Sequence, residues 1–280
     1  MSGTISGVNY SLLFAPAGTT GNASANMLTA LFSTAPPTAG GFVSTGSPLT
    51  DLKLAQQDQT ADVAAETKES VVSQTITAFT KAITKATSIQ SALLNPNVQQ
   101  VLLTASGLSS YIGETGLVQK AFLSNPSDPK SVVNQLGDST LLSTVQTYNF
   151  ATNGLKELQN PKIMSTLTNG YAEVMWRQSL DNATPGLSNA LNFLSSASSI
   201  SNVGDILGNP SAFYVITGAL GISPDIVFQS ETAQTQAINS RVDYSKFKDP
   251  AYVTSLTDQY LVSQQESAGT SSSSVPGLLA

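Results

Sequence analysis

The chain has 280 residues, and its 18 acidic and 12 basic residues give a formal net charge of −6. It contains neither cysteine nor histidine, which excludes disulfides, thiolate and imidazole metal sites, cysteine nucleophiles and a Ser–His–Asp triad. The few, dispersed basic residues and a pI near 4.5 argue against a nucleic-acid partner. Hydrophobic residues make up 40% of the chain, enough for a globular core. No apolar run approaches the roughly 20 residues that span a bilayer, so we expect no membrane span.

The first 50 residues carry no charged side chain, and the first basic residue is Lys53. Without a positively charged start, this segment does not have the pattern of a cleaved secretory signal peptide. Residues 1–50 and the Ser-rich residues 264–280 predict flexible tails, or segments that become ordered against a partner. The N-terminal segment is also a candidate export signal. Two apolar islands within it are candidate docking patches, comprising Leu12, Leu13 and Phe14 in the first and Leu28, Leu31 and Phe32 in the second.

From about residue 60 to residue 94 the chain has no Gly or Pro, and apolar residues recur at steps of three, four and seven. This pattern predicts a long amphipathic helix, on the order of 45 Å, with one apolar face. The face either packs on its own domain or forms a coiled-coil contact with another subunit. Its candidate interface residues are Val72, Ile76, Phe79 and Ile83.

Five Asn–Pro or Asp–Pro dipeptides precede apolar-periodic runs. Asn and Asp are favoured N-caps, and Pro is favoured at the first helical position. We therefore predict helix starts at each of them and, since no convincing alternating strand appears, an all-α compact bundle. The dipeptides are Asn95–Pro96, Asp128–Pro129, Asn160–Pro161, Asn209–Pro210 and Asp249–Pro250.

The sequence around two of these dipeptides repeats. Asn95, Pro96, Val101, Leu102, Gly107 and Leu108 match the residues 114 positions further on, from Asn209 to Ile222. A second similarity, at a distance of 89 positions, links the runs that begin at Pro161 and Pro250. We predict an all-α domain over 51–263 with two related helical units, about 90–150 and 200–263, and a connecting helix around 161–180.

No motif gathers the groups that catalysis would need. The chain has no Walker-type phosphate loop and no carboxylates at calcium-loop spacing. Glu173 and Arg177 are four positions apart, which is the spacing of an ordinary helical ion pair. We expect no catalytic residues, no metal, no cofactor and no small-molecule substrate.

Several blocks between about residue 70 and residue 263 resemble a bacterial family known as a flagellar domain of unknown function. The blocks include DPKS followed by LGD, then YNF, WRQSL, and ALGI–P before the final Asp–Pro helix. In that family the blocks occur in the same order. The resemblance implies an all-α fold and a motility-related role, since its members are typically encoded among flagellar genes, and it implies no catalytic residues.

Three functional hypotheses remain. The first is a non-enzymatic structural or assembly component of the flagellum, exported through the flagellar secretion channel to the axial structure, with flagellar proteins or further copies as partners. The second is a cytoplasmic regulator or chaperone that binds a flagellar partner. The third is a filament- or coat-forming protein outside motility. They differ in location, which is the flagellum or the cell exterior in the first and the cytoplasm in the second.

Overall fold

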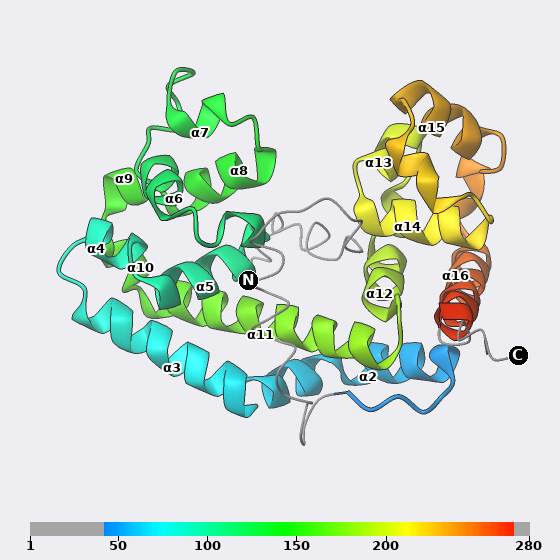
Figure 1. Cartoon of the computed structure of the whole chain (residues 1–280), viewed down its shortest axis with the longest axis horizontal. Helices are drawn as coiled ribbons and strands as arrows, with labels where there is room; N and C mark the ends of the chain where they lie inside the picture. Colours follow the sequence, from blue (N-terminus) through cyan, green and yellow to red (C-terminus); the bar gives the residue numbers. More distant parts are fainter. Residues whose placement is uncertain (1–41, 272–280) are drawn as a thin grey trace, which may run out of the picture. The chain divides into compact units, whose positions relative to one another are not determined.

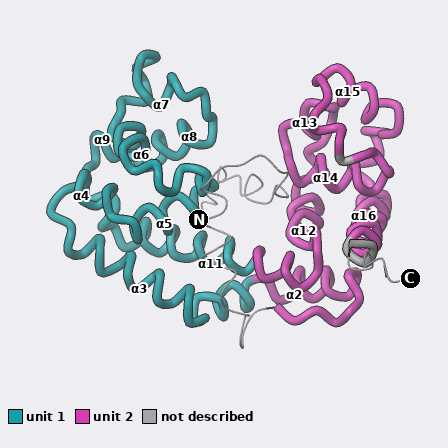
Figure 2. Tube along the Cα trace, in the orientation of Figure 1, with its two compact units in different colours: residues 1–41, 60–176 teal, residues 42–59, 177–280 magenta. Residues whose placement is uncertain are grey.

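The computed structural model describes residues 42–271, and within this range the chain is all-α with no β-strand (Figure 1). The predicted fold class is confirmed. The described residues form two compact units, which Figure 2 colours separately. Unit 1 comprises residues 60–176, and unit 2 comprises residues 42–59 and 177–271. Helices α2 (Pro48–Glu66) and α11 (Pro161–Ala183) contribute residues to both units.

The other elements follow in chain order. Unit 1 contains α3 (Ser70–Lys85), α4 (Ile89–Leu93), α5 (Pro96–Ala105), the 3₁₀-helix η2 (Ser109–Tyr111), α6 (Thr115–Phe122), α7 (Val132–Gln135), α8 (Ser139–Tyr148), α9 (Phe150–Asn153) and α10 (Leu155–Leu158). Unit 2 contains α12 (Leu187–Ser196), η3 (Ala197–Ser199), α13 (Val203–Leu207), α14 (Pro210–Ala219), η4 (Pro224–Phe228), α15 (Glu231–Asn239), η5 (Tyr244–Lys248) and α16 (Pro250–Ser271).

Four of the five predicted Asx–Pro helix starts are confirmed, at α5, α11, α14 and α16. The prediction at Asp128 is wrong. Its carboxylate accepts a hydrogen bond from the Lys130 amide at 2.9 Å, as a cap would, but the next helix begins only at Val132. The Asn134 side-chain amide donates to the Pro126 and Asp128 carbonyls at 3.0 and 2.8 Å, which holds the segment in a loop.

The run predicted as one long helix is divided into three. Breaks lie at residues 67–69 and 86–88, so that the apolar stripe belongs to α3 alone. Ala86 takes an extended conformation, and Ser88 then starts α4 with a capping box to Ser91. This local hydrogen bonding competes with continuation of the helix, because Ser side chains satisfy backbone groups at a new helix start.

The described range includes parts of both segments for which the sequence predicted flexible or partner-ordered tails. Residues 42–50 belong to unit 2, and α16 continues through residue 264 to Ser271. Ser44 and Thr45 donate hydrogen bonds to Asp51, which explains the order at the start of the range.

The two units repeat the same local geometry at the predicted distance of 114 positions. The α4 capping box of Ser88 and Ser91 recurs in α13 as Asn202 and Asp205. Helices α5 and α14 have corresponding bounds, and each is followed two residues after its end by a glycine, Gly107 or Gly221, whose φ angles of 73° and 62° suit the left-handed position after a helix C-terminus.

The repeat begins earlier than the sequence indicated, within α3 and α12. Phe79 and Phe193 lie 114 positions apart, and both are buried. The third helix of each unit is also equivalent. Tyr171 of α11 is buried in unit 1, and Tyr260 of α16 is buried in unit 2, where it accepts a bond from Asn189 at 3.4 Å. Each unit therefore packs three corresponding helices together, namely α3, α5 and α11 in unit 1 and α12, α14 and α16 in unit 2.

Candidate interaction surfaces

The predicted interface on α3 lies in the core of unit 1. Val72, Phe79 and Ile83 are buried, and Ile76 is partly buried against the same core. In this fold the stripe packs on its own unit, and its side chains are not open to a partner. The other predicted interface residues, Leu12, Leu13, Phe14, Leu28, Leu31 and Phe32, lie outside the described residues.

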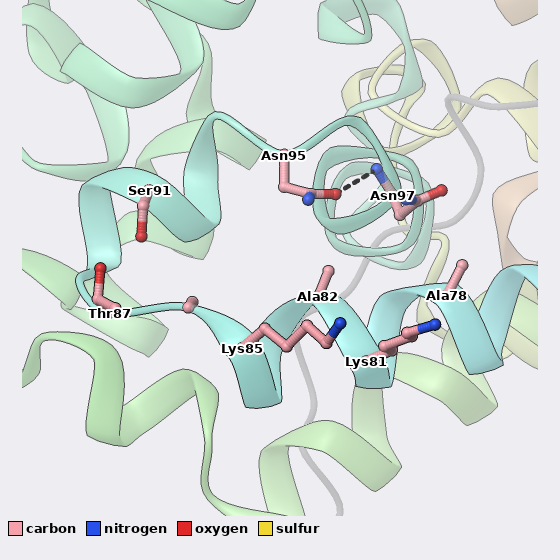
Figure 3. Close-up of a pocket in the computed structure, with 9 residues that line it drawn as sticks. Ala78, Lys81, Ala82, Lys85, Thr87, Ser91, Asn95 and Asn97 are labelled. Atoms are coloured by element: carbon pink, nitrogen blue, oxygen red, sulfur yellow. Dashed lines mark hydrogen bonds between the residues drawn. The ribbon is translucent and has the colours of Figure 1, made fainter.

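An open groove of about 440 Å³ lies on unit 1 between α3 and the start of α5 (Figure 3). Three alanines of α3 and of the turn after it form the floor of the groove, and their small side chains leave space above them. Ser91 of α4 and the amide side chains of Asn95 and Asn97 line the opposite side. Asn95 is held in place because its side chain accepts a hydrogen bond from the Asn97 backbone amide at 2.9 Å. The alanines are Ala78, Ala82 and Ala86.

Two lysines give this groove a positive charge. Lys81 and Lys85 are one helical turn apart on α3 and both line the groove (Figure 3). Within residues 42–271 neither ammonium group is paired with a carboxylate. We refer to the groove with its two lysines as the α3–α5 groove. The sequence predicted that these lysines lie on the helix face opposite the apolar stripe. It could not predict the groove, because the other side of the groove comes from α4 and the start of α5.

An exposed aromatic side chain stands out on unit 2. Phe228, at the end of η4, is 82% exposed, and its neighbour Val227 is 41% exposed. The carboxylates of Asp225 and Glu231 are exposed on either side of it in sequence. We refer to residues 225–231 as the Phe228 turn.

The Phe228 turn is fixed at several points. Ile226 is buried and anchors η4 to unit 2. The side-chain amide of Gln234 donates to the Gln229 carbonyl at 3.0 Å, and Ser230 caps α15 by accepting from Ala233. The backbone that bears the exposed ring of Phe228 is therefore fixed by burial and hydrogen bonds on both sides of it. The sequence pattern did not single out Phe228, because it lies in an apolar run with Ile226, which is buried, and Val227, which is exposed.

A buried carboxylate holds the start of unit 2. Asp51 is 0% exposed and accepts hydrogen bonds from Ser44 Oγ at 2.5 Å, from the amide and hydroxyl of Thr45 at 2.8 and 2.7 Å, and from Thr184 Oγ1 at 2.6 Å. Burial alone raises the pKa of Asp51, but these hydrogen bonds outweigh it, and the pKa lies below its ordinary value. A second cavity, of about 240 Å³, lies beside this cluster and is lined in part by Ser44, Thr184 and Leu261. The hydrogen bonds therefore stabilise the buried charge of the Asp51 carboxylate, which has a structural role in holding the start of unit 2.

Glu66 is a buried carboxylate of unit 1 with the opposite shift. Burial, and secondarily the negative charge of Glu69, raise its pKa to about 7.

Within the described part of the chain, no three carboxylates gather in a way that would hold a metal ion. None of the helices between residues 42 and 271 has both the length and the apolar content of a membrane span.

Comparisons with known proteins give a fold relative and a family. The crystal structure of protein AGR_C_984 from Agrobacterium tumefaciens aligns with a TM-score of 0.59 over 83% of this chain and 99% of that one. At 18% identity the likeness concerns the fold alone. No curated protein sequence matches the chain. Residues 105–253 match the family described as "Protein of unknown function (DUF1217)", and this match covers more than half of the chain. The chain therefore belongs to the DUF1217 family.

Proposed function

We propose that the protein is a non-enzymatic structural or assembly component of the bacterial flagellum. In this proposal it leaves the cell through the flagellar secretion channel and joins the axial structure by contacts with flagellar proteins or further copies. The observation that carries the proposal is the ordered set of blocks between about residues 70 and 263 that resembles a family encoded among flagellar genes. The DUF1217 match over residues 105–253 lies within the same part of the chain.

The surfaces of the two units support a role in assembly. An assembly protein acts through surfaces that a partner can cover, and exposed apolar side chains beside charges are typical of such surfaces. The α3–α5 groove and the Phe228 turn have this character. The uncharged N-terminal segment, with its apolar islands, adds a candidate for export or docking.

Deletion of the gene tests the flagellar role. We expect the deletion strain to swim poorly on soft agar or to carry fewer flagella under the electron microscope, and a plasmid copy to restore both. Unchanged swimming and unchanged flagellar number would refute the proposal.

Fractionation tests the location. We expect the native protein in basal bodies or external filaments. Protein found only in the cytosol would favour the cytoplasmic regulator or chaperone instead. Ordered assemblies of the purified protein, together with normal motility in the deletion strain, would favour a filament- or coat-forming protein outside motility.

A reporter fusion tests the export segment. Residues 1–50 fused to a reporter enzyme should appear in the medium of a strain with a working flagellar export apparatus. They should remain in cells that lack this apparatus. Equal retention in both strains would remove the export function from this segment and leave the assembly role to the folded units.

A further inference from the structure

We propose that the protein associates with itself head to tail, with the Phe228 turn of one copy docked in the α3–α5 groove of a second copy. The proposal rests on the proposed function only in making the protein a building piece, since the contact itself is argued from charge, shape and exposure. The groove is on unit 1 and the turn on unit 2, so each copy carries both halves of the contact.

The first argument is the fit of an aromatic anchor to an apolar floor. Phe228 is 82% exposed, and burying an aromatic ring in a partner is a common source of binding energy at interfaces. The α3–α5 groove offers about 440 Å³ above three alanine side chains, which is within the range of pockets that take a small ligand. The ring therefore has an open apolar floor to cover on the second copy.

The second argument is charge complementarity. The groove carries Lys81 and Lys85, and the turn carries Asp225 and Glu231 before and after the ring. An aromatic ring placed between the two walls brings carboxylates toward ammonium groups that have no partner within their own unit. Such pairs at the rim of a contact set its orientation and steer the encounter.

The net charges of the whole units disfavour one alternative contact. Unit 1 has 8 acidic and 7 basic residues, whereas the described part of unit 2 has 10 acidic and 5 basic residues. A contact between unit 1 of one copy and unit 2 of another is therefore less repulsive than a contact between two copies of unit 2.

The third argument is that the internal repeat has diverged at both surfaces. The positions that correspond to Lys81 and Lys85 in unit 2 are Ser195 and Ser199, so unit 2 has lost or never gained the basic wall. The position in unit 1 that corresponds to Phe228 is Glu114, and the 3₁₀-helix η2 of unit 1 is shorter than η4. Each unit thus carries one half of the contact and lacks the other half.

In an open chain, a contact between two different surfaces leaves one free groove and one free turn after every addition. The contact can also close into a ring, of which the smallest is a pair in which each copy fills the groove of the other. In both cases association should increase as the protein concentration rises.

The test measures the mass of the purified full-length chain by sedimentation velocity over a concentration series. We expect the wild type to associate as its concentration rises, and association to weaken at high salt because the charges at the rim are screened. A groove variant, Lys81→Glu with Lys85→Glu, and a turn variant, Phe228→Ala, should each associate at least tenfold more weakly.

Matched controls separate the contact from general surface effects. Lys120→Glu with Lys130→Glu makes the same charge change at exposed lysines of unit 1 outside the groove, and it should leave association unchanged. Val43→Ala removes an apolar side chain that is 82% exposed, as Phe228 is, and should also have no effect. Circular dichroism checks that every variant is folded.

Mixing gives the decisive result. The groove variant keeps an intact turn, and the turn variant keeps an intact groove. An equal mixture should therefore form a 1:1 dimer that grows no further, although each variant alone stays monomeric. In a single chain, adding Asp225→Lys and Glu231→Lys to the groove variant should restore association.

Three results would overturn the inference. They are a wild type that stays monomeric at every concentration, association that neither variant weakens, and a mixture that yields no dimer. Any of these can occur while the deletion strain still loses motility, in which case the flagellar proposal stands without this contact. Conversely, if the mixed variants form the predicted dimer and the deletion strain swims normally with its usual number of flagella, the results support the contact and refute the flagellar role.

Discussion

Replacing Asp51 by alanine removes the acceptor of a four-bond cluster and provides a stringent test of how unit 2 is held together. The carboxylate joins Ser44 and Thr45, which precede α2, to Thr184, which follows α11. Thr184 is 133 positions away in sequence, so the substitution breaks a tertiary connection and a local turn at once.

The magnitude follows from the burial of each donor. Hydrogen bonds to a charged group contribute about 1.5–3 kcal/mol each, and the upper part of this range applies where water cannot replace the lost acceptor. The Thr184 bond is buried, whereas the bonds from Ser44 and Thr45 are part-buried and can be replaced by water. We expect a loss of about 3 kcal/mol, because the variant leaves the buried Thr184 hydroxyl without its acceptor and removes the part-buried bonds as well. This corresponds to a melting temperature lower by roughly 6–12 °C for a chain of this size.

The assay is urea unfolding at pH 7, followed by circular dichroism, with two companion variants. Asp58→Ala changes an exposed carboxylate of the same helix and should shift the free energy of unfolding by less than about 0.5 kcal/mol. Thr184→Val removes one donor, and a double-mutant cycle with Asp51→Ala should give a coupling of about 1–2 kcal/mol.

The pH dependence gives an independent check of the same cluster. Because the folded-state pKa of Asp51 lies below its ordinary value, its contribution is fully present above about pH 4. It is lost as the pH falls through the folded-state pKa. A loss under about 0.5 kcal/mol for Asp51→Ala, or a coupling near zero, would refute the reasoning that the cluster holds unit 2.

Three further predictions concern the cores of the two units. Glu66 has a folded-state pKa of about 7, above its ordinary 4.5, so the free energy of unfolding should fall as the pH rises from about 4.5 to 7. Glu66→Gln should flatten this dependence and stabilise the protein at pH 8 by on the order of 1–2 kcal/mol; an unchanged pH profile in urea titrations would contradict a buried, uncharged carboxyl. Gly218→Ala should destabilise unit 2 by about 1–3 kcal/mol in thermal melts, because the added methyl group would lie 2.7 Å from Tyr260 Cδ2; a gain in stability from better helix propensity would contradict the close packing. Phe79→Asp with Ile83→Asp should abolish the cooperative unfolding of unit 1 seen by hydrogen exchange, because both side chains are buried; a folded variant that merely stops associating would return α3 to the role of an interface.

Local signals carried much of the fold. The Asx–Pro pairs marked α5, α11, α14 and α16, because an N-cap bond and a proline at the first helical position act within three residues of each other. Gly107 and Gly221 marked the ends of α5 and α14 for a similar reason. The left-handed conformation after a helix depends on one residue, and glycine adopts it without a steric cost. The repeat was visible because the two units preserved these same short-range signals.

Tertiary contacts decided the rest. Asp128–Pro129 carries the same signal as the other pairs, yet the Asn134 amide holds its backbone in a loop. The sequence likewise placed Phe79 and Phe228 in segments with other apolar residues, and it could not say that Phe79 would be covered by the core while Phe228 stayed exposed. Burial depends on which distant helix packs over a side chain. Periodicity within one segment therefore defines an apolar face, and only the fold determines whether that face is closed by the chain or left for another molecule.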